Sequence, residues 1–391
     1  MARFVYADNA ATTQVIQEVL DEMLPYFSEK YGNPSSLYSL GRVSREAIST
    51  ARGRVASALG AEEQEIFFTS GGSEADNWAI RGIANAMASK GKHLITTKIE
   101  HHAVLHTMKA LEKEGFHVTY LDVKENGIVD PADFASAIRP DTTFATVMYA
   151  NNEIGSVQPI AKLGEICSSR NVIFHTDAVQ AVGHLPIQVK EQHIQLLSLS
   201  AHKFHGPKGV GALYVQKGLR FPNLIEGGAQ ERNRRAGTEN VAGIVGLGKA
   251  IEVSCSDMEK NGQKTRQLRD RLISGILKIP AARLNGDREK RLDGNVNVSF
   301  EGIEGEPLLL QLDQNGICAS AGSACTSGSL DPSHVLIAIG LKRETAYGSL
   351  RLTLSDRNTD EDVDTILEVL PKIVEQLRAV SPRWKNMQNG G

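Results

Sequence analysis

A lysine that follows a short apolar run is the first side chain that could do chemistry. Residues 196–200 have the pattern of a buried strand, and Ala201-His202-Lys203 comes directly after it. Ligands of open parallel sheets bind beyond the carboxyl ends of the strands. A lysine amine that loses its proton in such a place can form a Schiff base with a carbonyl compound. The alternative is an ordinary surface lysine in a turn.

An aspartate ends a neighbouring apolar run. Asp177 closes the expected strand 172–177, so it should lie at the same edge of the sheet as Lys203. A carboxylate there could stabilise a protonated pyridine nitrogen, the charge that makes pyridoxal phosphate an electron sink. Asp177 could instead cap a turn. The pairing of Asp177 with Lys203 favours the cofactor more strongly than either residue does alone.

A glycine turn between an expected strand and an expected helix could bind a phosphate. The strand 65–69 is followed by Ser70-Gly-Gly-Ser-Glu-Ala-Asp. Free amides and the dipole at a helix start attract anions by up to about 2 kcal/mol. Gly72 would let the backbone approach closely, and Ser73 would add a hydroxyl. The alternative is an N-cap with Asp76 closing a capping box, which leaves the doubled glycine unexplained.

One cysteine stands in a run of small residues that cannot bury it, Ala319-Ser-Ala-Gly-Ser-Ala-Cys325-Thr-Ser-Gly-Ser-Leu. The other cysteines, Cys167, Cys255 and Cys318, occupy segments in which a free thiol can be buried, as is usual. We therefore expect Cys325 on an exposed loop, as a nucleophile whose thiolate is favoured by nearby positive charge.

Two further patterns carry less weight. His102 and His106 stand one helical turn apart, but no third ligand stands out, so a metal site is not expected. The stretch from Gly243 to Ala250 resembles a nucleotide P-loop, but it lacks the Ser or Thr and the preceding strand that a P-loop requires.

The elements that position these residues alternate between strand and helix. Expected strands are 65–69, 93–97, 117–122, 143–150, 172–177, 196–200 and 211–215, and expected helices are 15–27, 44–59, 74–88, 103–114, 131–138 and 161–170. Such alternation predicts an α/β fold with a mostly parallel seven-stranded sheet between helices.

The pattern changes after residue 262. Strands 295–300 and 349–354 and helices 306–314, 332–339 and 359–377 predict a smaller α+β domain. We expect a large cofactor-binding domain at 15–262, and a small domain formed by 1–14 and 263–391 that carries the Cys325 loop.

The bulk composition limits the partners. The 391 residues carry a net charge of −3, which argues against a nucleic-acid partner. Four cysteines are too few for a disulfide framework and suit a reducing cytoplasm. Neither a signal-peptide pattern nor an apolar run of membrane-spanning length is visible, so no membrane partner is expected.

Several long motifs together resemble the cysteine desulfurases of class V aminotransferase ancestry, in the NifS/IscS-like branch. They are Asp8-Asn-Ala-Ala-Thr-Thr, Tyr31-Gly-Asn-Pro-Ser-Ser, Glu100-His-His-Ala, Asn151-Asn-Glu-Ile-Gly, His175-Thr-Asp-Ala-Val-Gln, Ser200-Ala-His-Lys, Arg235-Ala-Gly-Thr-Glu-Asn and Gly322-Ser-Ala-Cys-Thr-Ser-Gly. The resemblance implies the fold type I architecture of pyridoxal-phosphate enzymes.

The resemblance also implies roles. Lys203 would form the Schiff base, Asp177 would face the ring nitrogen, and His101 would stack on the ring and shuttle protons. The other implied cofactor contacts are Asn152 and Gln180 at the ring hydroxyl side, Gly72, Ser73, Ser200 and His202 at the phosphate, and Thr238 reaching the phosphate of a neighbouring subunit, which implies a homodimer. Arg351, with Asn152, would bind the substrate, because guanidinium grips a carboxylate in a fork.

The implied reaction converts L-cysteine to L-alanine and leaves the sulfur on Cys325 as a persulfide, for an iron–sulfur scaffold protein or another acceptor. Two departures leave that acceptor open: Ser73 stands where relatives often have threonine, and the C-terminal tail does not resemble the housekeeping branch. The long cysteine loop argues against the short-loop branch. Another pyridoxal-phosphate enzyme of the same fold, such as an aminotransferase or a selenocysteine lyase, stays as an alternative, and so does a non-catalytic scaffold.

Overall fold

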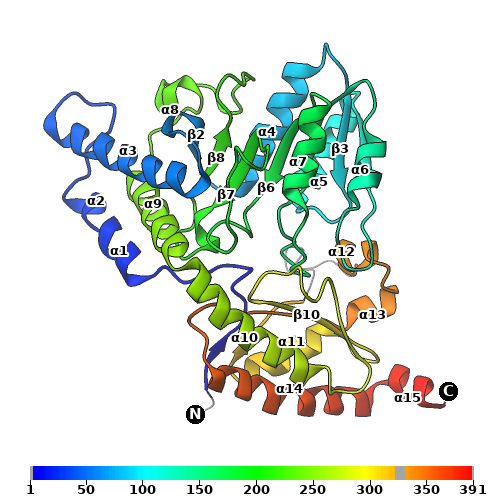
Figure 1. Ribbon diagram of the computed structural model, residues 1–391. Helices are drawn as coiled ribbons and strands as arrows, with labels where there is room; N and C mark the ends of the chain where they lie inside the picture. The colour runs from blue at the N-terminus through cyan, green and yellow to red at the C-terminus, as the bar shows by residue number, and fades with distance from the viewer. Residues whose placement is uncertain (1–2, 322–330, 390–391) are drawn as a thin grey trace.

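Seven short strands form the main sheet of the computed structural model, which describes residues 3–321 and 331–389 (Figure 1). The strands are β2 (Ile66–Thr69), β3 (His93–Thr97), β4 (His117–Leu121), β5 (Thr142–Thr146), β6 (Ile173–Asp177), β7 (Leu196–Ser200) and β8 (Gly211–Val215). Their order is β2-β8-β7-β6-β5-β3-β4, and only β8 runs antiparallel to its neighbours. The predicted seven-stranded, mostly parallel sheet is confirmed.

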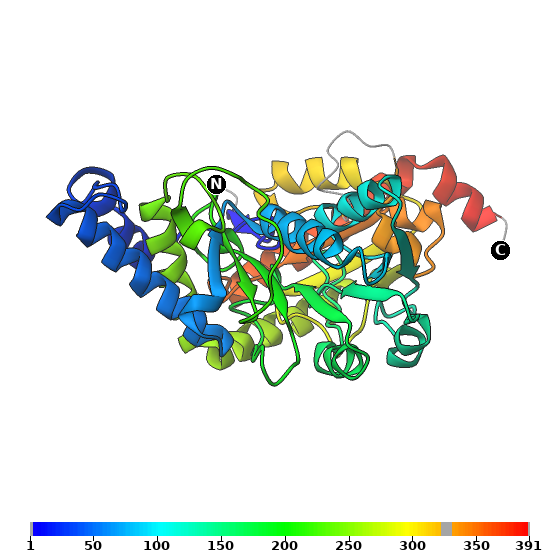
Figure 2. The same cartoon turned by 90° about the horizontal axis from the view of Figure 1, so that it is seen from above.

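Helices cover both faces of this sheet (Figure 2). Because successive side chains of a strand point to opposite faces, neighbouring residues join different cores. Phe67 packs with α4 (Gly72–Met87) and α5 (His102–Lys113), whereas Phe68 packs on the face of α3 (Ser39–Leu59), α7 (Ile160–Ser169) and α9 (Val241–Ser256). Six of the strands are therefore buried along nearly their whole length, as a sheet covered on both sides requires, whereas the edge strand β4 is partly exposed.

A separate core surrounds a three-stranded antiparallel sheet in the order β12-β10-β9. Its strands are β9 (Ala282–Leu284), β10 (Asn295–Phe300) and β12 (Ser349–Thr353), and it packs with α10 (Met258–Ile276), α11 (Gly305–Gln314) and α14 (Asp360–Val380). The N-terminal strand β1 (Val5–Tyr6) pairs with β11 (Ile317–Cys318) beside this core. The division into 15–262 and 1–14 with 263–391 stays a prediction, and α10 runs across its boundary.

The remaining helices differ in detail from the expected pattern. Pro25 divides the helix expected at 15–27 into α1 (Gln17–Met23) and α2 (Pro25–Ser28), because proline begins a helix more readily than it continues one. The rest are α6 (Pro131–Ala137), α8 (Gln230–Asn233), α12 (His334–Ala338), α13 (Arg343–Tyr347) and α15 (Pro382–Asn389). Across 3–321 and 331–389, no helix is long and apolar enough to cross a membrane.

Candidate active site

A cavity of about 400 Å³ opens at the carboxyl edge of the main sheet and reaches the small domain. It is lined by Ala10, Ala11, Gly72, Ser73, Asp76, His101, Met148, Asn152, Asp177, Val179, Gln180, Ser200, His202, Lys203 and Arg351. Ten of the twelve residues that the sequence singled out therefore meet in one place. Thr238 lies elsewhere, and Cys325 lies outside the described residues.

Lys203 ends the short 3-10 turn Ala201–Lys203 that follows β7. Its Nζ donates hydrogen bonds to the carbonyl oxygens of Ala10 and Ala11, at 2.6 and 2.8 Å. The Gln180 amide also donates to the Ala10 carbonyl, at 3.0 Å. The N-terminal segment thus forms one wall of the cavity and holds the amine in it.

Asp177 is the last residue of β6 and is 5% exposed. One of its carboxylate oxygens accepts the amide of Val179 at 2.9 Å. Burial raises the pKa of Asp177, and the neighbouring side chains of His101 and Lys203 oppose that rise. The carboxylate and the amine thus line the same small cavity from adjacent points of the sheet edge.

His101 is the N-cap of α5, and its Nδ1 accepts the Ala103 amide at 3.2 Å. Burial lowers the pKa of His101, and Asp177 opposes that effect. With Nδ1 occupied as an acceptor, Nε2 carries the proton of the neutral ring. A neutral imidazole at the cavity wall is suited to taking and returning protons.

The glycine turn forms an anion cradle at the start of α4. Gly71 has φ of 156°, which glycine alone adopts readily, and a Cβ on Gly72 would lie 2.6 Å from the side chain of Val179. The first amides of the helix have no intrahelical acceptor and lie beside Ser200 and His202. Burial lowers the pKa of His202 to about 4, so its ring is neutral.

The alternative capping role of Asp76 is wrong. The N-cap of α4 is Gly71 without a side-chain hydrogen bond, and Asp76 is 1% exposed. A side chain one turn after Gly72 projects from the same face of the helix. That face is turned to the sheet, so Asp76 enters the cavity.

These groups fit pyridoxal phosphate. Small-ligand sites have volumes of roughly 300 to 1,000 Å³, and this cavity has about 400 Å³. It offers an anion cradle at Gly72 and Ser73, an amine at Lys203 and a carboxylate at Asp177. Those three groups match the phosphate, the aldehyde and the ring nitrogen of the cofactor.

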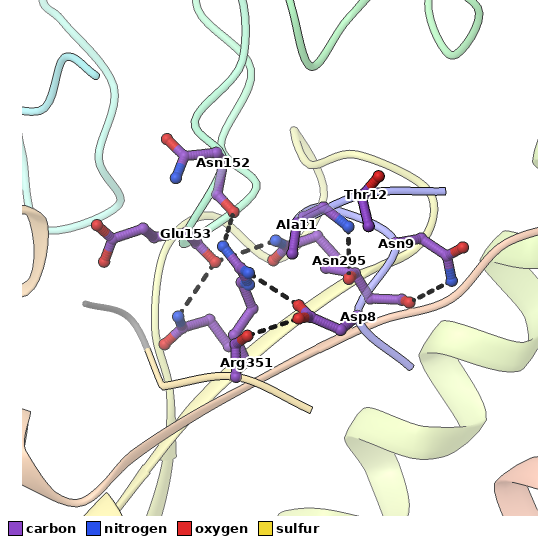
Figure 3. A network of polar contacts seen from close by, with 12 residues as sticks. Asp8, Asn9, Ala11, Thr12, Asn152, Glu153, Asn295 and Arg351 are labelled. Carbon is purple, nitrogen blue, oxygen red and sulfur yellow. Dashed lines mark hydrogen bonds and ion pairs between the residues drawn. The ribbon is translucent and has the colours of Figure 1, made fainter. Parts of the chain in front are cut away.

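A buried arginine of the small sheet lines the cavity and forms an ion pair with Asp8 (Figure 3). Arg351, in β12, is 2% exposed, and its Nη2 lies 2.8 Å from Oδ1 of Asp8. Nη1 donates to the carbonyl oxygen of Asn152 at 3.1 Å, while Nε has no partner among residues 3–321 and 331–389. Asp8 also accepts the Ser320 hydroxyl at 2.7 Å. The arginine therefore keeps donor capacity beside the cavity.

A second buried acid lies behind this pair. The amide of Asn295 donates to the carbonyl oxygen of Glu153 at 3.0 Å (Figure 3), and the amide of Asn297 donates to the same oxygen at 3.1 Å. The Glu153 carboxylate accepts the hydroxyl of Ser333, which caps α12. Burial raises the pKa of Glu153 to about 7. The large domain, the small sheet and α12 therefore meet at this acid.

Thr238 lies apart from these groups, next to a small cavity of about 70 Å³ that it shares with Gly237 and Glu239. It does not line the main cavity of its own chain. Its contact with the phosphate of a neighbouring subunit stays a prediction.

Comparisons with known proteins agree with this site. Residues 5–366 match the family model for class-V aminotransferases. The cysteine desulfurase IscS of Clostridium botulinum is 60% identical over 389 residues, which cover 99% of this chain and 98% of that protein. The cysteine desulfurase IscS of Methanosarcina thermophila is 59% identical, over 97% of this chain and 94% of that protein. A solved NifS-like protein has a TM-score of 0.91 and 38% identity, over 96% of this chain and all of that one.

The chain therefore belongs to the class-V aminotransferase family, whose enzymes depend on pyridoxal phosphate. Within that family it stands with the cysteine desulfurases of the IscS and NifS kind.

Proposed function

We propose that the protein is a pyridoxal-phosphate-dependent desulfurase that takes sulfur from L-cysteine onto Cys325. The observation that carries this proposal is the single cavity lined by Lys203, Asp177 and Arg351, in a chain that is 60% identical to a cysteine desulfurase. A solved relative that is 38% identical, over 91% of this chain, is named SspA in complex with cysteine. The complex of this relative with cysteine supports cysteine as the substrate.

The cofactor, when bound, supplies a ring that accepts the electron pair of a broken bond at the substrate's α-carbon. Lys203 binds the cofactor covalently, and the charge of Asp177 favours a protonated ring nitrogen. His101, neutral and facing the cavity, moves a proton to and from the substrate. Arg351 binds the carboxylate, and Asn152 holds the guanidinium from the other side.

Sulfur transfer requires a second thiol. The Cys325 thiolate forms a bond with the sulfur of the substrate while the carbon–sulfur bond breaks. The electron pair of that bond stays with the substrate carbon, which takes up a proton and becomes alanine. Cys325 is left as a persulfide, and no external oxidant is consumed.

Mass spectrometry after incubation with L-cysteine tests the sulfur transfer. We expect one added sulfur on Cys325. The Cys325→Ala variant should keep the visible absorbance of the cofactor and bind cysteine, but it should release no sulfide. Cys318, a half-buried free cysteine in β11, gives the matched control variant Cys318→Ala. Wild-type sulfide release by Cys325→Ala would show a lyase that needs no persulfide.

An exposed apolar surface on the large domain supports the homodimer. It comprises Leu24, Phe27, Tyr31, Leu37 and Tyr38, around α2 and the start of α3, and Leu37 is 88% exposed. Apolar patches of this kind commonly mark protein interfaces. We propose that a second copy covers it and contributes Thr238 to the neighbouring phosphate site.

Sedimentation velocity of Leu37→Glu tests this interface. We expect a dimer for the wild type and a shift towards monomer for the variant. Leu310→Glu, at an exposed leucine of the small domain, should leave the dimer intact. A dimer that is equally stable in both variants would contradict the proposed interface.

We also propose that the protein acts in the cytoplasm and delivers its sulfur to an iron–sulfur scaffold protein or another acceptor. The names of the relatives and the reducing environment that its cysteines suit support this role. Transfer of labelled sulfur from loaded Cys325 to a purified scaffold protein would test it.

A further inference from the structure

A second buried carboxyl group lies beside Asp177. Asp76 projects from α4 and is 1% exposed, against 5% for Asp177. A carboxylate oxygen of Asp76, one of Asp177 and a ring nitrogen of His101 all lie within 4.8 Å of one another. Two carboxylates this close and out of water cannot both ionise without a large cost in free energy. The pair is therefore expected to hold one proton.

The surroundings decide which carboxyl group holds that proton. Asp177 faces Lys203 and His101 and accepts the Val179 amide, and all three favour its charged form. Asp76 has weaker support, from the neutral hydroxyl of Ser198. Its Oδ1 lacks a hydrogen-bond partner in the described part of the chain.

His175, the nearest side chain that could carry a positive charge, does not stabilise the charged form of Asp76 either. Nε2 of His175 lies 3.7 Å from Oδ1 of Asp76. However, Nε2 is 2.9 Å from the Ser198 hydroxyl and Nδ1 is 2.7 Å from the Thr146 hydroxyl, so both ring nitrogens are occupied. Burial lowers the pKa of His175 to about 3, so its ring is neutral. The Ser198 hydroxyl favours the charged form of Asp76, but this neutral donor contributes less to the pKa of Asp76 than burial and the charge of Asp177.

We propose that Asp76 is a positioning residue that stays protonated and donates a hydrogen bond to Asp177, which leaves Asp177 as the one charge opposite the cofactor's ring nitrogen. Burial, followed by the charge of Asp177, raises the pKa of Asp76 well above its ordinary value. The site then buries one negative charge instead of two, and the hydrogen bond fixes the orientation of the Asp177 carboxylate. The proposal rests on the cofactor of the proposed function.

Infrared spectroscopy of the holoenzyme with ¹³C-carboxyl-labelled aspartate tests the protonation state directly. We expect the wild type at neutral pH to show a protonated carboxyl band that shifts with the label. Glu100 and Glu153, which are also buried, carry no label, so their bands stay in place. The band should disappear in Asp76→Asn and persist in the control variant Asp287→Asn. A wild type without the band, or a band that survives Asp76→Asn, would overturn the proposal.

A second measurement separates the hydrogen bond from mere packing. Asparagine keeps the donor of a protonated carboxyl group, and alanine does not. A lost hydrogen bond to a charged group costs about 1.5–3 kcal/mol, or roughly 10- to 100-fold in an equilibrium constant. We therefore expect Asp76→Ala to weaken cofactor affinity at least about tenfold, and Asp76→Asn to weaken it less than about threefold.

Equal losses of affinity in the two variants would contradict the proposed donor. Neither the infrared band nor the cofactor affinity depends on cysteine turnover. A protein that binds the cofactor and shows the labelled band, but transfers no sulfur to Cys325, would refute the desulfurase proposal and leave this one intact.

Discussion

The two walls of the cavity are built in different ways. The cofactor wall consists of residues that follow strands of one parallel sheet, such as Asp177 after β6 and Lys203 after β7. The substrate wall is an ion pair between Asp8 and Arg351, which are 343 positions apart in the chain. The pairing of neighbouring strands therefore brings Asp177 and Lys203 to one edge of the sheet, whereas the substrate wall requires both ends of the chain to meet.

The two walls also differ in how their charged groups are neutralised. The cofactor wall buries carboxyl groups without a stable ion pair, so their pKa values rise. The substrate wall neutralises its arginine with an aspartate before any substrate is present. The cofactor wall is thus suited to place one carboxylate charge opposite the ring nitrogen of the cofactor. The substrate wall is suited to bind an incoming carboxylate through Arg351, which already contacts Asp8.

The largest effect is expected at the cofactor wall. Lys203→Ala removes the amine that binds the cofactor, so the absorbance of the bound Schiff base should disappear and cysteine turnover should fall by roughly 10³-fold or more. Absorption spectra and sulfide release are the measurements. Lys208→Ala, at an exposed lysine five positions later, is the control. A normal spectrum for Lys203→Ala would place the Schiff base elsewhere.

The substrate wall should give a smaller effect that is specific for cysteine. Arg351→Lys keeps the positive charge but loses the fork of donors, which costs about 1.5–3 kcal/mol. We expect kcat/KM for cysteine to fall roughly 10- to 100-fold, with the cofactor still bound. Steady-state kinetics measure the change, and Arg357→Lys at an exposed arginine nearby controls for it. If both variants lose the same amount, Arg351 does not bind the carboxylate.

The difference between the walls explains what the sequence could predict. Apolar runs predict most of the strands to within one residue, since most of them are buried on both faces, but the strand expected at 143–150 ends at Thr146. Strand ends then place Asp177 and Lys203 without further information. The prediction was less accurate where a local signal competes, as at Pro25, which interrupts an otherwise continuous helical pattern.

The residues that sequence reasoning missed have no local signal. Asp8 reaches Arg351 because β1 pairs with β11 and the next segment lies along β12, and no short-range pattern records that pairing. From the sequence, Asp76 is considered only in the alternative to the phosphate site, as the residue that would close a capping box. Its spacing of four from Gly72 was the available clue, since it places both residues on one helical face.

A substitution at Asp8 tests whether this carboxylate orients Arg351 in the substrate wall. Asp8→Asn removes the charge that orients Arg351 and keeps a hydrogen-bond acceptor, so we expect KM for cysteine to rise by about 3- to 10-fold, near 1 kcal/mol. Kinetics at several salt concentrations measure it, with Asp21→Asn on α1 as an exposed control. A KM below that of the wild type would show that Asp8 competes with the substrate instead of positioning its partner.

The smallest effect is expected at Glu153, the buried acid behind the substrate wall, and it concerns the free energy of unfolding. The pKa of Glu153 is raised to about 7, whereas an unfolded glutamate titrates near 4.5. Over that interval the folded protein keeps a proton that the unfolded chain has released, so the stabilising contribution declines as pH rises.

Glu153→Gln removes this dependence and keeps an acceptor for Ser333. Between pH 6 and pH 7, the free energy of unfolding of the wild type should therefore fall by about 1 kcal/mol relative to that of Glu153→Gln. Denaturant unfolding at the two pH values measures the difference, with Glu29→Gln as an exposed control. If the free energies of unfolding of the wild type and of Glu153→Gln differ by the same amount at both pH values, Glu153 is ionised at both. Water would then reach the Glu153 carboxylate better than its burial indicates.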